Sequence, residues 1–219
     1  MPLNRPYKSI TELPDTIPVF PLPGALLLPR AELPLNIFEP RYVAMIDDAM
    51  RADRLVGMIQ PDPRADPRDP APALEKIGAL GRITQIAESG DGRYVLNLTG
   101  VARFRIIEET RAPTPYRQCR VDWFEFASDL SPDPGASVVD RAALLGALRG
   151  FAEARGMQVE WQGAEKAPIE ALVNMFSMMT PFDAIEKQAL LEAEDVPARA
   201  AKLIEIAGGG AARKPRTLH

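Results

Sequence analysis

Apolar positions change their spacing along this chain near residue 127. Before that point they occur in short runs with frequent alternation, which is typical of strands. After it they recur at i, i+3, i+4 and i+7, the spacing of one buried helix face. The pattern predicts an α+β chain with a β-rich part over 17–126, a proline-containing linker over 127–137 and a helical part over 138–207.

The two ends of the chain lack a sustained apolar pattern. Residues 1–16 are interpreted as a loosely held arm. Residues 208–219 begin with three glycines and continue with basic residues, so they are interpreted as a flexible tail.

The β-rich part is expected to hold several short strands. Prolines bound the apolar runs 17–20 and 33–38, which favours strand starts and sheet edges. Residues 89–92, Ser-Gly-Asp-Gly, indicate a hairpin because glycine accepts positive φ. Residues 103–106 alternate polar and apolar positions, as a half-buried strand does. Runs of strands with a single early helix suggest a small closed or partly closed barrel.

That early helix is predicted over residues 40–52. Pro40 suits the first helical position, where a missing N–H costs nothing. One buried face is predicted to carry Tyr42, Met45, Ile46, Ala49 and Met50.

The helical part is predicted to contain helices over 138–155 and 167–179. A third helix is expected to start at Thr180-Pro181 and to reach about Glu194. A last helix is expected to stop at Gly208, and Trp161 is placed in a polar loop between helices.

Composition and charge narrow the class of protein. The net charge is −4 and the pI about 5.2, so nucleic acid is not an expected partner. Neither a signal-peptide pattern nor an 18-residue apolar run occurs, and there is one cysteine. We therefore expect a cytoplasmic protein without a membrane partner.

The usual residues of catalysis and metal binding are sparse. The single histidine is His219, the last residue, which excludes histidine-based triads and the HExxH zinc motif. No phosphate-binding P-loop motif occurs, and Cys119 is interpreted as a packing residue. Asp62, Asp66 and Asp69 lack the spacing of a calcium loop. We expect no enzyme, no cofactor and no metal site.

A series of short motifs resembles the amino-terminal substrate-recognition domain of Lon proteases. Their order and spacing over about residues 17–206 make the resemblance specific. The motifs are Phe20-Pro21-Leu22, Pro34-Leu35-Asn36-Ile37-Phe38-Glu39-Pro40-Arg41-Tyr42, Val56-Gly57-Met58-Ile59, Asp91-Gly92-Arg93, Leu98-Thr99-Gly100-Val101, Arg103-Phe104-Arg105-Ile106, Pro115-Tyr116 and 186–192 with Arg199.

The resemblance implies a PUA-like β-barrel-type subdomain followed by an α-helical bundle, as in short stand-alone bacterial members. It also implies a role in binding unfolded or damaged polypeptide. Lon's ATPase and Ser-Lys peptidase modules are absent from this sequence. The motif residues interpreted as structural are Glu39, Pro40, Arg41, Asp91, Gly92, Gly100, Arg103 and Phe104.

Three functional hypotheses follow. The first is a non-catalytic polypeptide-binding module, an adaptor or a binder of unfolded protein, with contacts chosen from Leu35, Phe38, Tyr42, Met45 and Trp161. For the first four of these residues a core position is the stronger expectation. The second is an RNA-binding PUA-like module that uses a stripe of arginines on neighbouring strands: Arg103, Arg105, Arg111, Arg117 and Arg120. Pairing of these arginines with Glu108, Glu109 and Asp122 would dismiss it. The third is an enzyme of unknown type, which would need a deep polar pocket.

Overall fold

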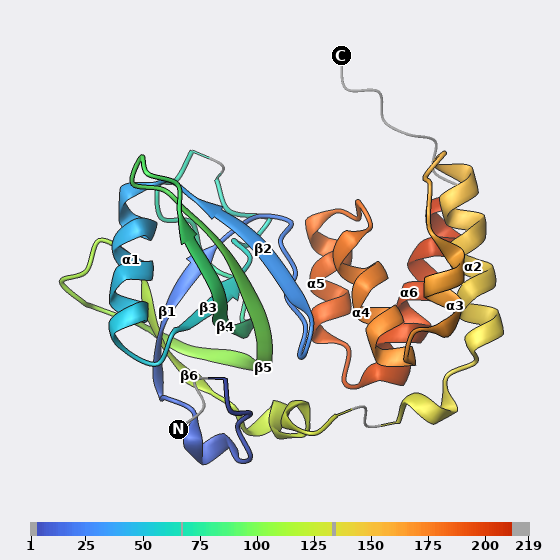
Figure 1. Cartoon of the computed structure of the whole chain (residues 1–219), viewed down its shortest axis with the longest axis horizontal. Helices are drawn as coiled ribbons and strands as arrows, with labels where there is room; N and C mark the ends of the chain where they lie inside the picture. The colour runs from blue at the N-terminus through green and yellow to red at the C-terminus, as the bar shows by residue number, and fades with distance from the viewer. Residues whose placement is uncertain (1–3, 67, 133–134, 212–219) are drawn as a thin grey trace. The chain divides into compact units, whose positions relative to one another are not determined.

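The chain forms two compact units in the computed structural model, which describes residues 4–66, 68–132 and 135–211 (Figure 1). The first unit is Met1–Pro132 with Asp183–Ile185, and the second is Asp133–Phe182 with Glu186–His219. The division falls inside the predicted linker 127–137, and the predicted domain limits themselves stay a prediction.

The first unit is built on one six-stranded sheet. Its order is β2-β5-β4-β3-β1-β6, and β5 pairs with β6 as well. Only β1 and β3 are parallel. The strands are β1 Thr16–Pro21, β2 Glu32–Ile37, β3 Leu55–Ile59, β4 Ile77–Glu88, β5 Tyr94–Thr110 and β6 Gln118–Asp122.

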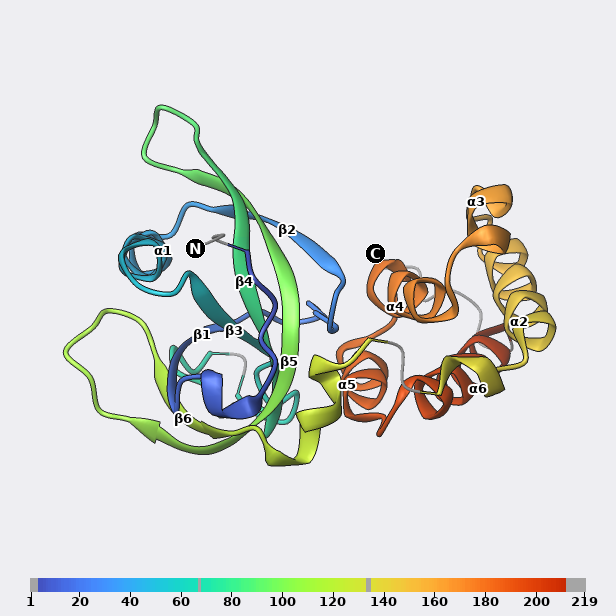
Figure 2. The same ribbon diagram turned by 60° about the horizontal axis from the view of Figure 1, so that its bottom comes forward.

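The long strand β5 closes the pairing into a circuit. Its first half pairs with β2 on one side and β4 on the other, and its second half pairs with β6. Register shifts between β4 and β5 and between β5 and β6 bend these strands, whose curvature Figure 2 shows. The six-stranded α+β architecture agrees with the predicted fold class. The circuit is the pairing that a barrel needs, while the PUA-like assignment stays a prediction.

The core of the first unit surrounds Phe104, which is fully buried. The Trp123 ring meets it edge to face at 5.9 Å, and its Nε1 donates to the Pro14 carbonyl at 3.1 Å. The amino-terminal segment contributes the buried Leu13 and a short 3₁₀ helix, Ile10–Glu12. Tyr7 and Ile10 also pack against this core, while most of residues 4–15 are exposed, and the assignment of an amino-terminal arm stays a prediction.

Helix α1, Pro40–Arg51, confirms the early helix with Pro40 in its first turn. Tyr42, Met45, Ile46 and Ala49 are buried, as the spacing predicted. Met50 was placed on the same face and is instead 38% exposed.

The second unit is helical. Leu144, Leu148, Leu172, Val173 and Leu203 form its buried apolar positions together with Phe151, whose ring lies 5.3 Å from that of Phe182. Helix α6 packs against α2 and α4. The helices are α2 Arg141–Ala154, α3 Trp161–Lys166, α4 Ile169–Met179, α5 Ala184–Glu192, whose first two residues belong to the first unit, and α6 Val196–Ala211.

Three predictions about the helices of the second unit are wrong. Trp161 begins the helix α3, whose first turn is capped by Glu160, and does not lie in a loop. Thr180 ends α4 and its N–H donates to the Phe176 carbonyl, so α5 starts only at Ala184. Helix α6 continues through the three glycines to Ala211, and the rest of the predicted tail lies outside the described residues. The 3₁₀ helix Phe124–Leu130 occupies the start of the predicted linker.

No helix within the described ranges combines the length and the apolar character that crossing a membrane requires.

Candidate functional site

A groove of about 360 Å³ lies at the junction between β2 and α1, and we call it the motif groove. It is made by the end of β1, by β2 and by the first turn of α1. Most of its lining side chains are apolar or proline, and Asn36, Glu39 and Arg41 add polar surface. The lining residues are Phe20, Pro21, Leu22, Pro23, Pro34, Leu35, Asn36, Ile37, Phe38, Glu39, Arg41 and Tyr42.

Alternation along β2 determines which side chains reach the groove surface. Leu35 is half-buried and Ile37 is buried, while Pro34 and Asn36 are exposed. The chain then turns into α1, and Phe38 is left 62% exposed at this turn. A large aromatic side chain therefore stands at the groove with most of its surface in water.

The floor of the groove is a stack of side chains. The Phe20 and Tyr42 rings lie 4.2 Å apart, and the Arg41 guanidinium lies 4.5 Å from the Tyr42 ring centre. Arg41 Nε donates to Glu39 Oε2 at 3.0 Å. Burial raises the pKa of Tyr42, an effect that the neighbouring Arg41 opposes. Because Glu39 and Arg41 neutralise each other, the groove favours apolar groups over charged ones.

The predicted contact residues fall into three environments. Leu35, Phe38 and Tyr42 line the motif groove together. Met45 is fully buried in the core beneath α1. Trp161 belongs to the second unit, where it is half-buried, stacks on Phe176 at 5.9 Å and lies beneath the Arg149 guanidinium at 5.2 Å. The binding roles of all five residues stay predictions.

Three arginines of the predicted stripe are paired with carboxylates, while Arg111 is exposed. Arg105 donates to Glu125, Arg117 to Glu109 and Arg120 to Glu108, with distances of 2.5 to 3.0 Å. Asp122 lies opposite Arg105 in the register of β5 and β6. Arg105, Arg117 and Arg120 therefore do not offer uncompensated positive charge to a phosphate backbone.

Arg103 was predicted on the polar side of a half-buried strand, and this is wrong. Its side chain is 1% exposed and pairs with Asp129, whose side chain is 8% exposed. Asp129 accepts from the Arg103 backbone N–H at 2.9 Å, from Nε at 2.8 Å and from Nη2 at 2.8 Å. Sequence reasoning missed Asp129 because it sits in a stretch interpreted as linker, and no local pattern links it to Arg103.

The chemistry available to the described residues is limited. Cys119 is fully buried, and this burial raises the pKa of its thiol to about 11, which disfavours the nucleophilic thiolate. No group of three or more metal-ligating side chains occurs in the described part of the chain.

Comparison with known proteins identifies the family of this chain. Residues 16–207 match the family described as the substrate-binding domain of ATP-dependent protease La (LON). The chain is 29% identical over 203 residues to Lon protease 2 of Myxococcus xanthus, covering 89% of this chain and 24% of that protein. It is 26% identical over 203 residues to Lon protease of Anaeromyxobacter dehalogenans, covering 89% and 23%. This chain thus spans about a quarter of the length of these relatives.

Solved structures share the fold. A Lon N-terminal domain protein from Xanthomonas campestris superposes with a TM-score of 0.59 at 23% identity, covering 87% of this chain and 97% of that one. The N-terminal domain of Lon protease from the Mycobacterium avium complex gives the same TM-score at 18% identity, covering 88% and 98%. With its two units, its motif groove and a match over residues 16–207, this chain belongs to the family of Lon substrate-binding domains.

Proposed function

We propose that this chain is a non-catalytic polypeptide-binding module that takes an extended apolar segment in the motif groove. In the cell it acts as an adaptor or as a binder of unfolded protein. The observation that carries the proposal is Phe38, 62% exposed beside an apolar groove at an edge strand. The cytoplasmic location expected from the sequence stays a prediction.

The edge strand supplies the backbone part of the interaction. Among the described strands, β2 pairs with β5 alone. Its outer edge therefore offers backbone hydrogen-bonding groups to an extended segment, as in β-strand addition. Apolar side chains of that segment then bury against Leu35 and Phe38, and the burial of apolar surface favours the complex.

The paired arginines support polypeptide over RNA. Affinity for a phosphate backbone comes from arginines and lysines that replace its counterions. Arg105, Arg117 and Arg120 each already have a carboxylate partner, and the net charge of the chain is −4.

A catalytic role has less support than a polypeptide-binding role. The motif groove is small and apolar, and the charged pair that lines it, Glu39 and Arg41, is mutually neutralised. The name Lon protease belongs to proteins of which this chain matches about a quarter, so we do not extend protease activity to it.

The substitution Phe38→Ala tests the groove. The probe is a fluorescent apolar peptide with an acetylated amino end and an amidated carboxyl end, and binding is followed by anisotropy. Phe38→Ala should weaken binding about 10-fold, since burial of a phenylalanine contributes about 1.5–3 kcal/mol. The melting temperature should stay unchanged, because Phe38 is mostly exposed already.

Phe124→Ala is the matched control. Phe124 is 78% exposed in the same unit and does not line the motif groove. It should bind the peptide as the unsubstituted chain does. Equal weakening by both substitutions, or none by Phe38→Ala, would remove the groove from the proposal.

A further inference from the structure

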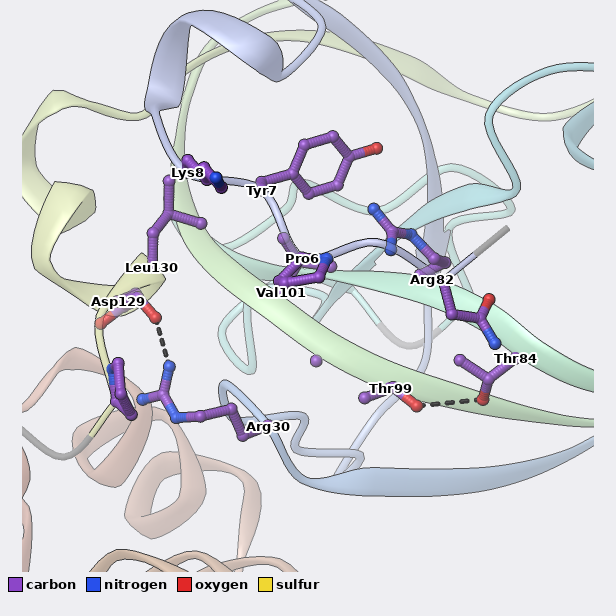
Figure 3. A pocket seen from close by; sticks show the side chains of 13 residues that line it. Pro6, Tyr7, Lys8, Arg30, Arg82, Thr84, Thr99, Val101, Asp129 and Leu130 are labelled. Atoms are coloured by element: carbon purple, nitrogen blue, oxygen red, sulfur yellow. Dashed lines mark hydrogen bonds between the residues drawn. The ribbon is translucent and has the colours of Figure 1, made fainter. Parts of the chain in front are cut away.

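A second and larger pocket lies in the first unit, and we call it the arm pocket (Figure 3). Its volume is about 630 Å³, and it shares no lining residue with the motif groove. Residues 4–8 form one wall, β4 and β5 form the base, and Arg30 and residues 129–132 complete the rim.

The inner surface of the arm pocket is apolar, and its side chains are held by the core behind them. Tyr7, Val101 and Leu130 line it, and each of them also packs against the buried core around Phe104. Figure 3 shows these three side chains around the opening. Because the core fixes them from behind, the apolar wall exists before any ligand arrives.

The charges around the arm pocket are predominantly positive. Lys8, Arg30 and Arg82 line it. Of its described lining residues, Asp129 alone carries a carboxylate, and Arg103 neutralises that carboxylate from the protein interior. Arg30 donates to the Asp129 backbone carbonyl, so among the described lining residues Lys8 and Arg82 supply the positive charge, and the low-dielectric walls strengthen its field.

Arg82 is held in place by a hydrogen bond and by an aromatic ring, which leaves further N–H donors for a ligand. It is 9% exposed, its Nη1 donates to the Arg5 carbonyl at 2.6 Å, and its guanidinium lies 4.4 Å from the Tyr7 ring centre. A guanidinium has five N–H donors in a fork that matches a carboxylate. The hydroxyls of Thr84 and Thr99, 3.0 Å apart, add polar groups on the same side of the pocket (Figure 3).

We propose that the arm pocket binds the carboxyl-terminal residue of a polypeptide. The α-carboxylate pairs with Arg82, and an apolar last side chain packs against Tyr7, Val101 and Leu130. The volume of about 630 Å³ lies in the usual range of ligand pockets. The inference rests on the proposed function, since it names the part of the polypeptide that a second site takes.

The test compares two versions of one peptide that ends in apolar residues, one with a free carboxylate and one amidated. The free acid should bind the full chain about 10-fold more tightly, because charge-assisted hydrogen bonds are stronger than neutral ones. Arg82→Gln should abolish this preference and leave the affinity for the amide unchanged. Arg120→Gln, which alters an arginine outside the pocket, should keep the full preference.

Arg82 is nearly buried, so a second variant guards against loss of folding. Lys8→Gln changes an exposed lysine that lines the pocket and should reduce the preference for the free acid without lowering the melting temperature. Retention of the preference in both variants would overturn the proposal.

Two further outcomes are decisive. Equal binding of acid and amide by the unsubstituted chain would overturn the arm-pocket proposal and leave the motif groove untouched, because the blocked peptide tests that groove separately. Competition by free hexanoate at the concentration of the peptide acid would overturn the assignment to a polypeptide terminus.

Discussion

Arg103 carries a positive charge into the interior of the first unit. Its guanidinium pairs with two oxygens of Asp129 beside a core of apolar side chains. Such a pair adds little to the free energy of unfolding compared with apolar residues of the same volume. Removing one partner is costly, because it leaves the other charge buried and unpaired.

We predict that Arg103→Ala or Asp129→Ala lowers the free energy of unfolding by about 3–5 kcal/mol, measured by urea denaturation. The matched control is Arg105→Ala. Its pair with Glu125 is 41% and 46% exposed, and its loss should cost about 0–1 kcal/mol. A small effect at both positions would contradict burial of the Arg103 charge.

Cys119 gives the stability a dependence on alkaline pH. Burial raises the pKa of its thiol from 9.0 to about 11, so the folded state keeps the proton that the unfolded state releases. A raised pKa contributes stability that is complete below the unfolded value and is lost as the pH rises through the folded value.

The free energy of unfolding should therefore fall by about 2–3 kcal/mol between pH 9 and pH 11. Denaturant titrations across this range measure the slope. Cys119→Val should reduce this slope. Tyr116, whose pKa rises from 10.0 to about 12 by burial and by its bond to Asp48, leaves a loss of similar size centred about one pH unit higher. An equal slope in both proteins would refute the assignment to Cys119.

At the scale of elements, the segment 28–31 is joined to β5 by backbone hydrogen bonds. The Arg30 N–H donates to the Gly100 carbonyl and the Gly100 N–H donates to the Ala31 carbonyl, both at 2.8 Å. A Cβ on Gly100 would stand 2.0 Å from the Leu28 carbonyl oxygen. This close approach gives a physical reason for glycine within the Leu98-Thr99-Gly100-Val101 motif.

Gly100→Ala should lower the free energy of unfolding by about 3 kcal/mol or more, because backbone atoms cannot move aside cheaply. Gly146→Ala in α2 is the control. Nothing lies within 4 Å of its added Cβ, so it should raise the free energy of unfolding by about 0.5–1 kcal/mol. Chemical denaturation measures both, and a tolerated alanine at 100 would rule out the steric reason.

Elements with strong local signals were predictable, and those decided by partners far along the chain were not. Pro40 and the spacing after it indicated α1 within one residue of its end. The short helix α3 was missed because Trp161 is followed by polar residues and a glycine, and its stability depends on the Phe176 ring beneath Trp161. The burial of Arg103 depends on Asp129, 26 residues away.

For the molecule as a whole, the sequence indicated the family and the change from strands to helices. It brought Leu35, Phe38 and Tyr42 into one hypothesis because they are neighbours in the chain. The sequence did not predict the arm pocket, because Tyr7, Arg82 and Asp129 come together only in the folded sheet.

Charge pairing over the whole surface predicts how binding responds to salt. The motif groove is apolar, so affinity for the blocked peptide should change less than about 2-fold between 50 and 500 mM salt. RNA should show no retention at physiological salt, since Arg105, Arg117 and Arg120 are paired. Steep loss of RNA affinity with added salt, measured by filter binding, would restore the RNA hypothesis.

The place of Pro34 on β2 has a consequence for the behaviour of many copies in solution. The circuit of paired strands leaves β2 as the open edge among the described strands, and an open edge is where identical chains can join into extended sheets. Pro34 lies within that strand and has no N–H to give an incoming copy. Because Pro34 withholds the same donor from any added strand, a client segment at this edge depends on apolar contacts in the motif groove more than on backbone hydrogen bonds.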